Sequence, residues 1–304
     1  ITIMIKDPAH HGACELNYHD IGDYLNREQK LAIIEDFGNI DGIDWEIVEP
    51  NIEGDWINQR DQSFDKFLPT GDKDNCNQEV IFAGFSSGIN SCRDYWVYNS
   101  TVDSVEKNIR TLIESYKADM NRFETICKDM PKDKWPDIES VINTDPKRIS
   151  WTRALKADAY RMKDLHYNSG SLTVSMYRPF FKRWFYFNRR LNEMVYQMPR
   201  IFPSSKHDNI ILSATGLGAS KGFSCLASKT IVDRHTVDTS QCFPLYWYER
   251  VEETKKPKGD LFSDQGTPDS DGYIRHEAIT DWALTSFQYH YSDSTITKED
   301  IFWY

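Results

Sequence analysis

The residues best suited to binding chemistry are gathered in one segment, YRPFFKRWFYFNRRLNEMVYQMPRIFP, which runs from Tyr177 to Pro203. From residue 178 to residue 206, seven basic residues accompany one acidic residue, a net +6 in a chain of formal net charge −11. The basic residues are Arg178, Lys182, Arg183, Arg189, Arg190, Arg200 and Lys206. A guanidinium group can donate paired hydrogen bonds to a phosphate or a guanine edge, and interleaved rings supply a rigid apolar surface. The segment therefore predicts a surface that contacts phosphates and bases.

The same rings also suit a protein core. Aromatic residues occupy both alternating sets of positions between residues 181 and 188, so both faces of an extended segment would carry rings. The two sets are Phe181, Arg183, Phe185 and Phe187, and Lys182, Trp184, Tyr186 and Asn188. Such a pattern is typical of a strand buried on both sides. The arginines fit a core less well, because Arg is rarely buried without a partner, so both interpretations stay open.

Four weaker candidates for nucleic-acid contact lie in polar stretches elsewhere in the chain. Asn58 and Arg60 can make bidentate contacts with adenine or guanine edges, although turn bonding in a surface loop is the favoured explanation for them. Arg93 ends a turn of small residues that can present backbone N–H groups to an anion. Lys221 lies in GLGASKG, which has the wrong order of Lys and Gly for a phosphate-binding P-loop, so a tight turn is the simpler interpretation.

No complete active site is visible in the sequence. It contains neither a GxSxG nucleophile elbow nor an HExxH metal motif, and the adjacent His10 and His11 lack further ligands at helical spacing. The six cysteines are scattered without a CxxC pair, which indicates reduced thiols and argues against a zinc ribbon or a disulfide framework. We therefore expect no catalytic residue and no metal site in this chain.

Composition sets broad limits on the fold and its surroundings. The 304 residues, 39% hydrophobic and 13% aromatic, suffice for one large packed domain or two ordinary ones. No apolar run reaches the roughly 18 residues of a membrane span, and no signal-like segment follows Ile1, so we expect a cytoplasmic protein cut from something longer. The net charge of −11 argues against non-specific DNA coating. It leaves room for a local basic groove, because only charges within roughly 8–10 Å dominate the field at a site.

The first part of the chain has the pattern of the end of an α/β domain. Residues Ile1–Ile5 read as a buried strand. A capping box at Asn26 and Gln29 then starts a helix with apolar residues at helical spacing, and Gly38 stops it. Strand and helix in this order would suit the last elements of a domain whose bulk lies upstream.

The clearest single element is a long amphipathic helix from Asp103 to Met130. Asp103 is the expected cap, Glu106 lies three residues later, and Pro131 stops the helix. At 1.5 Å per residue it would be roughly 40 Å long. Its apolar stripe consists of Val105, Ile109, Leu112, Ile113, Tyr116, Met120, Phe123, Cys127 and Met130. We expect this stripe to face a core.

The remaining patterns predict an α+β fold: mixed β-sheets with the long helix and flanking helices. Strands are expected at 79–84, 95–98, 171–187, 210–214, 230–232 and 241–248, and helices at 150–166, around 282–291 and at 295–302. Residues 188–190 are expected to form the turn between the aromatic strands, with residue 150 as the cap of the helix that precedes them. A polar loop is expected at 254–272.

Six motifs in order give the chain a resemblance to a known family. They are YHDIGDYLNREQKLAII (Tyr18–Ile34), GDWINQRDQSFDKFLPTGD (Gly54–Asp72), FSSGINSCRDYWVYN (Phe85–Asn99), the segment Tyr177–Pro203 quoted above, IVDRHTVDTSQCFPLYWYE (Ile231–Glu249) and ITDWALTSFQYHYSDSTITKEDIF (Ile279–Phe302). Together they resemble the C-terminal specificity part of type ISP restriction-modification enzymes and related helicase–methyltransferase fusion proteins. The resemblance covers nearly the whole chain.

The resemblance implies one part of a single-polypeptide bacterial defence enzyme against phage. That family joins an Mrr-like nuclease, an ATP-driven translocase, a coupler, an N6-adenine methyltransferase and a target recognition domain. Residues 1–49 would be the tail of the methyltransferase domain, and residues 50–304 would be the target recognition domain. The chain lacks an Asn-Pro-Pro-Tyr/Phe motif and a loop for S-adenosylmethionine. Catalysis, with S-adenosylmethionine, ATP and Mg, is therefore expected upstream, and this chain would hold no cofactor.

The resemblance also implies a partner, which is double-stranded DNA. Phosphate contacts would fix the register of the protein, and a few side chains would read base edges in the major groove. The candidates are Arg178, Lys182, Arg183, Arg189 and Arg190, with Asn58, Arg60, Arg93 and Lys221 as weaker ones. This interpretation requires the cations to share one concave face. The alternative, favoured by the acidic total charge, is a protein-interaction module that docks the upstream helicase and methyltransferase domains without reading DNA.

Overall fold

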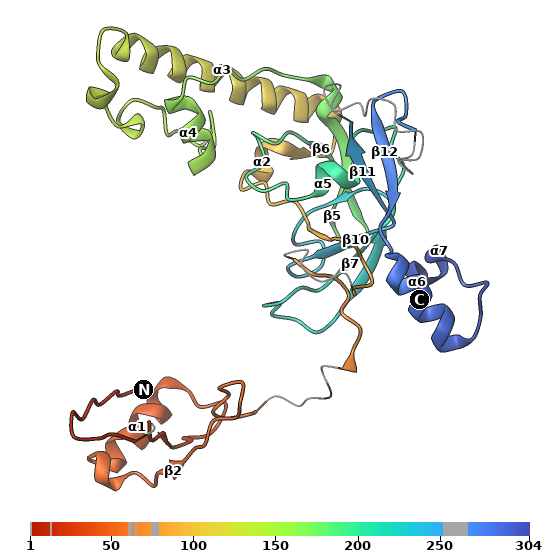
Figure 1. Ribbon diagram of the computed structural model, residues 1–304. Helices are drawn as coiled ribbons and strands as arrows, with labels where there is room; N and C mark the ends of the chain where they lie inside the picture. The colour runs from red at the N-terminus through yellow and green to blue at the C-terminus, as the bar shows by residue number, and fades with distance from the viewer. Residues whose placement is uncertain (1, 13, 60–62, 64–65, 74–78, 252–266) are drawn as a thin grey trace. The chain divides into compact units, whose positions relative to one another are not determined.

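The computed structural model describes residues 2–12, 14–59, 63, 66–73, 79–251 and 267–304. The chain divides into two compact units, residues 1–67 and residues 68–304 (Figure 1).

The first unit is built on one capped helix, α1 (Arg27–Phe37). The predicted capping box is confirmed, because Asn26 accepts from the Gln29 N–H and the Gln29 side chain accepts from the Asn26 N–H. Gly38 ends the helix with a φ of 65°, which glycine adopts without strain. A short antiparallel pair joins β1 (Asn17–Tyr18) to β2 (Glu46–Ile47), and a 3₁₀ turn, η1, covers Ile40–Gly42.

The first unit has no hydrophobic core of its own among its described residues. None of these residues is buried, and the same holds within α1. The apolar side chains of Leu31, Ile34 and Trp45 are all exposed. The predicted strand at Ile1–Ile5 is wrong, since the described residues 2–5 are exposed and have no regular structure. An extended segment needs a partner strand to satisfy its backbone groups, and the described part of this unit offers none there.

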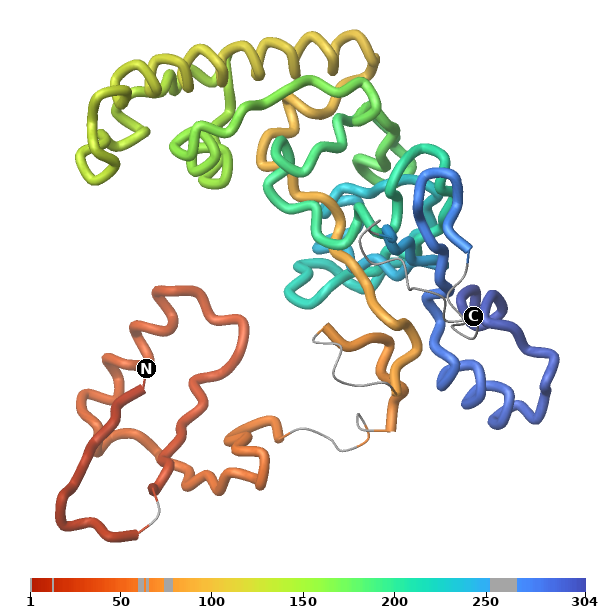
Figure 2. Tube along the Cα trace, turned by 45° about the horizontal axis from the view of Figure 1, so that its top comes forward, coloured from red at the N-terminus to blue at the C-terminus, as the bar shows by residue number. Residues whose placement is uncertain are grey.

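In the second unit, α3 (Val102–Cys127) confirms the predicted long helix. Its cap is Thr101, whose side chain accepts from the Ser104 N–H, and not Asp103, which lies in the first turn where a carboxylate suits the helix dipole. The predicted stripe is buried as far as Cys127, and Met130 lies exposed beyond the helix end. Figures 1 and 2 both show α3 extending away from the sheets with the following segment folded back alongside it.

The other helices of this unit are short. Thr152, not residue 150, caps α4, and a left-handed residue at Met162 (φ 53°) follows its end, so this helix stops well before residue 166. The predicted strand at 95–98 is mostly helical, and the two predicted C-terminal helices are confirmed. The helices described are α2 (Asp94–Val97), α4 (Arg153–Tyr160), α5 (Met198–Ile201), α6 (Asp281–Tyr291) and α7 (Lys298–Trp303), with 3₁₀ turns at Lys132–Lys134, Ile138–Ser140 and Ser169–Ser171.

Three sheets in the described part of the second unit complete an α+β fold, as predicted. The first has the order β4-β6-β5-β9, the second β3-β10-β7-β8, and the third pairs β11 with β12. The pairs described are antiparallel except that β9 lies parallel to β5. The strands are β3 (Ser86–Ser87), β4 (Tyr98–Asn99), β5 (Leu172–Arg178), β6 (Phe181–Tyr186), β7 (Ile211–Ala214), β8 (Cys225–Ser228), β9 (Ile231–Val232), β10 (Gln241–Pro244), β11 (Tyr246–Arg250) and β12 (Tyr273–Glu277).

Two further expectations about the strands are wrong. Residues 79–84 form only isolated bridges, in which Phe82 faces Gly71 and Ile279. The turn between the aromatic strands is Pro179–Phe180, because Arg178 pairs directly with Phe181. A proline cannot donate to a strand ladder and presets the backbone of a turn, so it ends β5 there. The turn at 188–190 comes after β6 instead.

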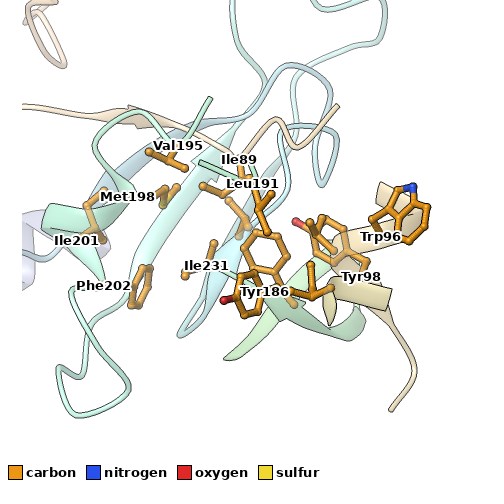
Figure 3. Close-up of a cluster of buried hydrophobic side chains, with 14 of the residues drawn as sticks. Ile89, Trp96, Tyr98, Tyr186, Leu191, Val195, Met198, Ile201, Phe202 and Ile231 are labelled. Atoms are coloured by element: carbon orange, nitrogen blue, oxygen red, sulfur yellow. The ribbon is translucent and has the colours of Figure 1, made fainter. Parts of the chain in front are cut away.

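Burial in the core shows which aromatic rings of β6 have a structural role. Figure 3 shows Tyr98, Tyr186, Leu191 and Ile231 within one buried cluster that continues along residues 195–202. Phe185 stacks on Tyr98 with ring centroids 4.4 Å apart and is fully buried. The last two residues of β6 are therefore core, as the alternation suggested, whereas its first residues are exposed. The aromatic segment serves the core at one end and reaches solvent at the other.

Candidate nucleic-acid interface

The exposed end of the β5–β6 hairpin, Tyr177–Arg183, is named here the hairpin tip. Its two-residue turn carries Phe180, which is 86% exposed, and Phe181 follows at 51%. Lys182 is exposed on the next position of β6. The register of β5 shifts at Tyr177, so that this residue stands outside the regular pairing. A bulge of this kind increases local twist and re-aims side chains.

Two guanidinium groups stack on the same ring at the hairpin tip. The Arg178 guanidinium carbon lies 4.0 Å from the centroid of the Tyr177 ring, and that of Arg183 lies 5.2 Å from it. Arg183 also lies 5.7 Å from the centroid of the Phe181 ring. Cation–π contacts of this kind orient the guanidinium planes. The rings thus hold these cations in place without neutralising them.

Of the two arginines, only Arg178 has a carboxylate partner in the described part of the chain. Arg178 Nη1 donates to Asp233 Oδ1 at 2.8 Å and to the Tyr177 carbonyl oxygen at 2.5 Å, so Arg178 is internally paired. Among the described residues, neither Lys182 nor Arg183 forms an ion pair, and the buried Nε of Arg183 has no hydrogen-bond partner there. Lys182 and Arg183 are therefore the cations of the tip that remain available to an anionic partner.

The buried Asp233 and the half-buried Asp94 form an acidic pair beneath the hairpin tip. The Tyr177 hydroxyl donates to Asp94 Oδ2 at 2.9 Å, and Ser91 donates to the other oxygen of that carboxylate. Burial raises the pKa of the Asp233 carboxyl, while the His235 N–H and the Arg178 guanidinium oppose this effect. These bonds tie the tip to segments far away in the sequence and make it a rigid projection.

A second loop, Gly216–Ser224 between β7 and β8, carries the other exposed apolar side chains of this region. Leu217 is 93% and Phe223 84% exposed, and Lys221 is exposed between them. The N–H and hydroxyl of Ser220 donate to Asp238 Oδ2 at 2.6 and 2.8 Å, and these bonds lower the pKa of that carboxyl. The expected tight turn is therefore an anchored loop.

Glycine is required at the start of this loop for a specific reason. A Cβ on Gly216 would lie 2.4 Å from the Thr239 carbonyl oxygen, so only glycine permits the close approach of the two backbones. The Gly216 N–H donates to the Asp238 carbonyl oxygen at 3.2 Å.

The hairpin tip and the Gly216–Ser224 loop share one support, the segment Asp233–Ser240. Asp233 at its start binds Arg178 of the tip, and Asp238 near its end binds Ser220 of the loop. The same segment carries Arg234, whose Nη1 donates to the Tyr196 hydroxyl at 2.8 Å. The Asp233–Ser240 segment therefore contacts both loops. The tip, the loop and this segment are named here the shared surface, and they carry Lys182, Arg183, Lys221 and Arg234.

Arg189 and Arg190 do not belong to this surface, contrary to the expected single cationic face. They follow the opposite end of β6, and a strand of six residues separates its ends by roughly 17–20 Å. Residues that are close in sequence are thus divided because the strand between them crosses the core. Arg189 is exposed, and it forms no ion pair within the described ranges.

Arg190 is engaged internally on every side of its guanidinium group. Its Nε donates to Asp158 Oδ2 at 2.8 Å, Nη1 donates to the Asp164 carbonyl oxygen, and Nη2 donates to the Lys163 carbonyl oxygen at 3.2 Å. This arrangement joins the turn after β6 to the end of α4. The geometry favours a structural role for Arg190 over a DNA contact.

The Asp158 carboxyl should make stability depend on acid pH. Burial opposes its ionisation, but hydrogen bonds from Arg190 and Lys163 outweigh that effect and lower its pKa in the folded state. The stabilisation is therefore complete above the unfolded pKa near 4 and is lost as the pH falls through the lower folded value. Urea unfolding between pH 3 and 7 should show the stability difference between wild type and Asp158→Asn shrinking below about pH 4. The exposed Asp129, replaced by Asn, is the control, and a pH-independent difference contradicts the assignment.

Of the weaker candidates, Lys221 lies in the Gly216–Ser224 loop, whereas Arg93 lies inside the second unit. Arg93 is 4% exposed, and burial lowers its pKa to about 10 against the attraction of Glu193. Its Nη2 donates to Thr152 Oγ1 at 2.8 Å, and the side chain lines a pocket of about 530 Å³ together with Asp94 and Asp233. A duplex cannot reach a guanidinium so deeply buried without rearrangement. Asn58 is exposed in the first unit, and Arg60 lies outside the described residues.

Two further basic residues, one in the Tyr177–Pro203 segment and one just after it, also contact other side chains of the protein. The Arg200 guanidinium lies 5.2 Å from the centroid of the Trp247 ring, and Lys206 forms an ion pair with Asp271 at 3.0 Å.

In the described ranges no group of three or more His, Cys, Asp or Glu residues is placed to hold a metal ion. Within the same ranges, no helix combines the length and apolar character needed to cross a bilayer.

Sequence reasoning missed four functional candidates: Phe180, Phe223, Arg234 and Asp233. The signal for Phe180 was present, since Pro-Phe between two alternating runs marks a turn, and a phenylalanine in a turn is unusual. Arg234 and Asp233 lie in the IVDRHTVD motif, but nothing in the sequence places that motif beside the hairpin tip. The parallel pairing of β9 with β5 does so in the structure.

The geometry agrees with what the chain resembles. The family model of the Type ISP C-terminal specificity domain matches residues 80–304. The chain belongs to this family. The resemblance found in the motifs is thus confirmed, as is the expected similarity of the fold to a target recognition domain. No curated protein matches the chain.

Solved structures similar to this Type ISP specificity domain include three large DNA-bound proteins. A nuclease-deletion mutant of the Type ISP restriction-modification enzyme LlaGI, in complex with a DNA substrate mimic, shares 32% identity over 91% of this chain with a TM-score of 0.68. The DrdV–DNA complex shares 30% over 95% with a TM-score of 0.74, and the ATP-dependent Type ISP enzyme LlaBIII bound to DNA shares 26% over 94% with a TM-score of 0.69. The chain spans 24%, 26% and 17% of those proteins, respectively.

Proposed function

We propose that this Type ISP specificity domain recognises a specific sequence in double-stranded DNA on behalf of a restriction-modification enzyme. The observation that carries the proposal is the pair of uncompensated cations, Lys182 and Arg183, on a rigid tip with exposed rings. Such a surface offers both phosphate donors and apolar contact, despite the net charge of −11 of the whole chain. The DNA complexes of LlaGI, DrdV and LlaBIII support the same partner.

The contacts divide into two kinds. Lys182, Arg183 and Arg234 would hold phosphates and so set the position of the duplex, because their charges are free of carboxylate partners among the described residues. The side chains of the Gly216–Ser224 loop would contact base edges, where Lys221 can donate to a guanine and Leu217 or Phe223 can meet a thymine methyl group. The loop is the better place for base contacts because it is anchored only at its ends and near Ser220.

The first unit would connect the specificity domain to its enzyme. We propose that residues 1–49 are the tail of an N6-adenine methyltransferase domain and that residues 50–304 form the recognition domain. The unburied apolar side chains of the first unit, among them Leu31, Ile34 and Trp45, support this assignment, since such a surface is normally covered by a partner. S-adenosylmethionine, ATP and Mg would bind upstream domains, and methylation, translocation and cleavage in the cytoplasm would follow recognition by this one.

The proposal is tested by selecting DNA with the intact 304-residue chain. A random pool of duplexes is bound at 50 mM salt, the retained fraction is sequenced, and the enriched duplex is titrated against a scrambled duplex at increasing salt. We expect one enriched sequence, preferred over its scrambled control by at least tenfold. Equal binding of all duplexes would contradict sequence recognition.

The competing function is a docking module that does not read DNA. The exposed apolar surface of the first unit favours it, and that observation is independent of the hairpin tip. A complete absence of DNA retention at 50 mM salt would support this alternative. Sequencing the methylated positions in a host that expresses a full-length parent would then show whether recognition resides elsewhere.

A further inference from the structure

Phe180 occupies a position that the fold itself does not favour for phenylalanine. Its φ is +60°, a left-handed conformation that glycine adopts freely and bulky residues avoid. Its side chain is 86% exposed, so it contributes almost no burial to the core. Pro179 before it restricts the turn further. Neither packing nor backbone preference therefore explains this residue, and strain at an exposed site points to a function outside the fold.

The setting of Phe180 gives the ring both rigidity and a charged surround. The turn has only two residues, and Arg178 at its base is fixed by Asp233 and by the Tyr177 ring. Lys182 and Arg183 follow on the next strand without ion pairs in the described part of the chain. The ring thus projects from a stiff support, and two cations without ion-pair partners among the described residues follow it within three residues. This combination suits insertion into a polyanion better than docking on an apolar protein surface.

We propose that Phe180 is a wedge that inserts between stacked base pairs of the bound duplex and kinks it. The inference rests on the proposed DNA recognition and adds a physical mode of engagement to it. Aromatic side chains stack on bases irrespective of sequence, and apolar wedges between base steps unstack and bend the duplex. Lys182 and Arg183 would hold the phosphates beside the opened step. Bending would bring the flanking DNA toward the second loop, with Phe223 and Lys221, across the Asp233–Ser240 segment.

The decisive variant is Phe180→Gly, because it should weaken DNA binding without lowering the stability of the fold. Glycine relieves the left-handed strain, so the thermal unfolding midpoint should stay equal to that of wild type or rise by a few degrees. Affinity for the enriched duplex should fall about tenfold, as expected for the loss of one stacked ring. A residue with a merely structural role would lower both quantities together, so a lowered midpoint overturns the proposal.

The wedge is observed directly with 2-aminopurine placed at successive positions of the enriched duplex. Wild type should raise the fluorescence at one base step, and Phe180→Gly should abolish that rise. Tyr289→Ala is the matched control, since Tyr289 on α6 is equally exposed (86%) and lies outside the proposed surface. If the duplex binds specifically but no position brightens, the wedge is overturned and recognition stands. If no duplex is enriched or bound, recognition itself fails, and the wedge fails with it.

Discussion

Replacing Lys182 and Arg183 together with alanine is expected to weaken duplex binding by roughly 10–100-fold at 0.1 M salt. Each phosphate contact contributes about 0.9 to the slope of log affinity against log salt, so the loss of two contacts lowers the magnitude of that slope by about 2. The loss should apply equally to the enriched and the scrambled duplex, because phosphates carry no sequence. Titrations of both duplexes between 50 and 300 mM salt measure the effect.

Two further variants show whether the effect comes from these two positions, and not from lost packing or from the loss of any positive charge. Lys182 is exposed and its truncation should not disturb packing, so Lys182→Ala alone should lower the slope by about 1. Arg189→Ala removes the same charge from the opposite end of β6 and should leave the slope unchanged. An unchanged slope in the double variant, or an equal change in Arg189→Ala, would remove the hairpin tip from the interface.

Replacing Arg190 with alanine is expected to destabilise the second unit by about 2–4 kcal/mol. The change leaves the Asp158 carboxylate with Lys163 as its remaining ion-pair partner. It also removes one donor from each of the Lys163 and Asp164 carbonyl oxygens, of which the first keeps the Tyr116 hydroxyl. Equilibrium urea unfolding, followed by circular dichroism, measures the loss. Lysine should not restore stability, because a single ammonium group cannot reproduce the fork that bonds a carboxylate and two carbonyl groups at once.

DNA binding separates this structural role from a contact role. At temperatures where the variant stays folded, Arg190→Ala should keep the wild-type salt slope, since its guanidinium already serves internal partners. Arg189→Ala, the neighbouring change, should alter stability by less than about 0.5 kcal/mol, as is usual for exposed positions. Two results would contradict the structural role and indicate that Arg190 contacts DNA. One is a stability loss below about 0.5 kcal/mol for Arg190→Ala, and the other is a clear drop in the slope of its log affinity against log salt.

Local patterns in the sequence predicted local structure well. The capping box at Asn26 and the apolar stripe of α3 depend on neighbours three and four residues away, so the chain alone reveals them. Predictions that depended on distant partners failed more often. Residues 79–84 have the composition of a strand, but the described chain offers Phe82 only single bridges to Gly71 and Ile279.

The candidate site was harder to predict than the fold. The seven basic residues lie close together in the sequence. In the structure, however, Arg183 lies near one end of β6 and Arg190 follows the other end. Asp233, which neutralises Arg178, lies 55 residues further along the chain, and only tertiary pairing brings it there. Charge counts along a segment therefore overestimate the positive surface, because internal carboxylate partners are invisible at that stage.

The common support of the two loops has a consequence for how such domains acquire new targets. The Gly216–Ser224 loop depends on the rest of the unit through a few bonds at its ends and through Asp238. Its outward side chains, Leu217 and Phe223, touch little else. Under the proposed function, replacing this loop alone would change the side chains offered to the bases and leave Lys182 and Arg183 in place. A change of preferred site would then need no new fold.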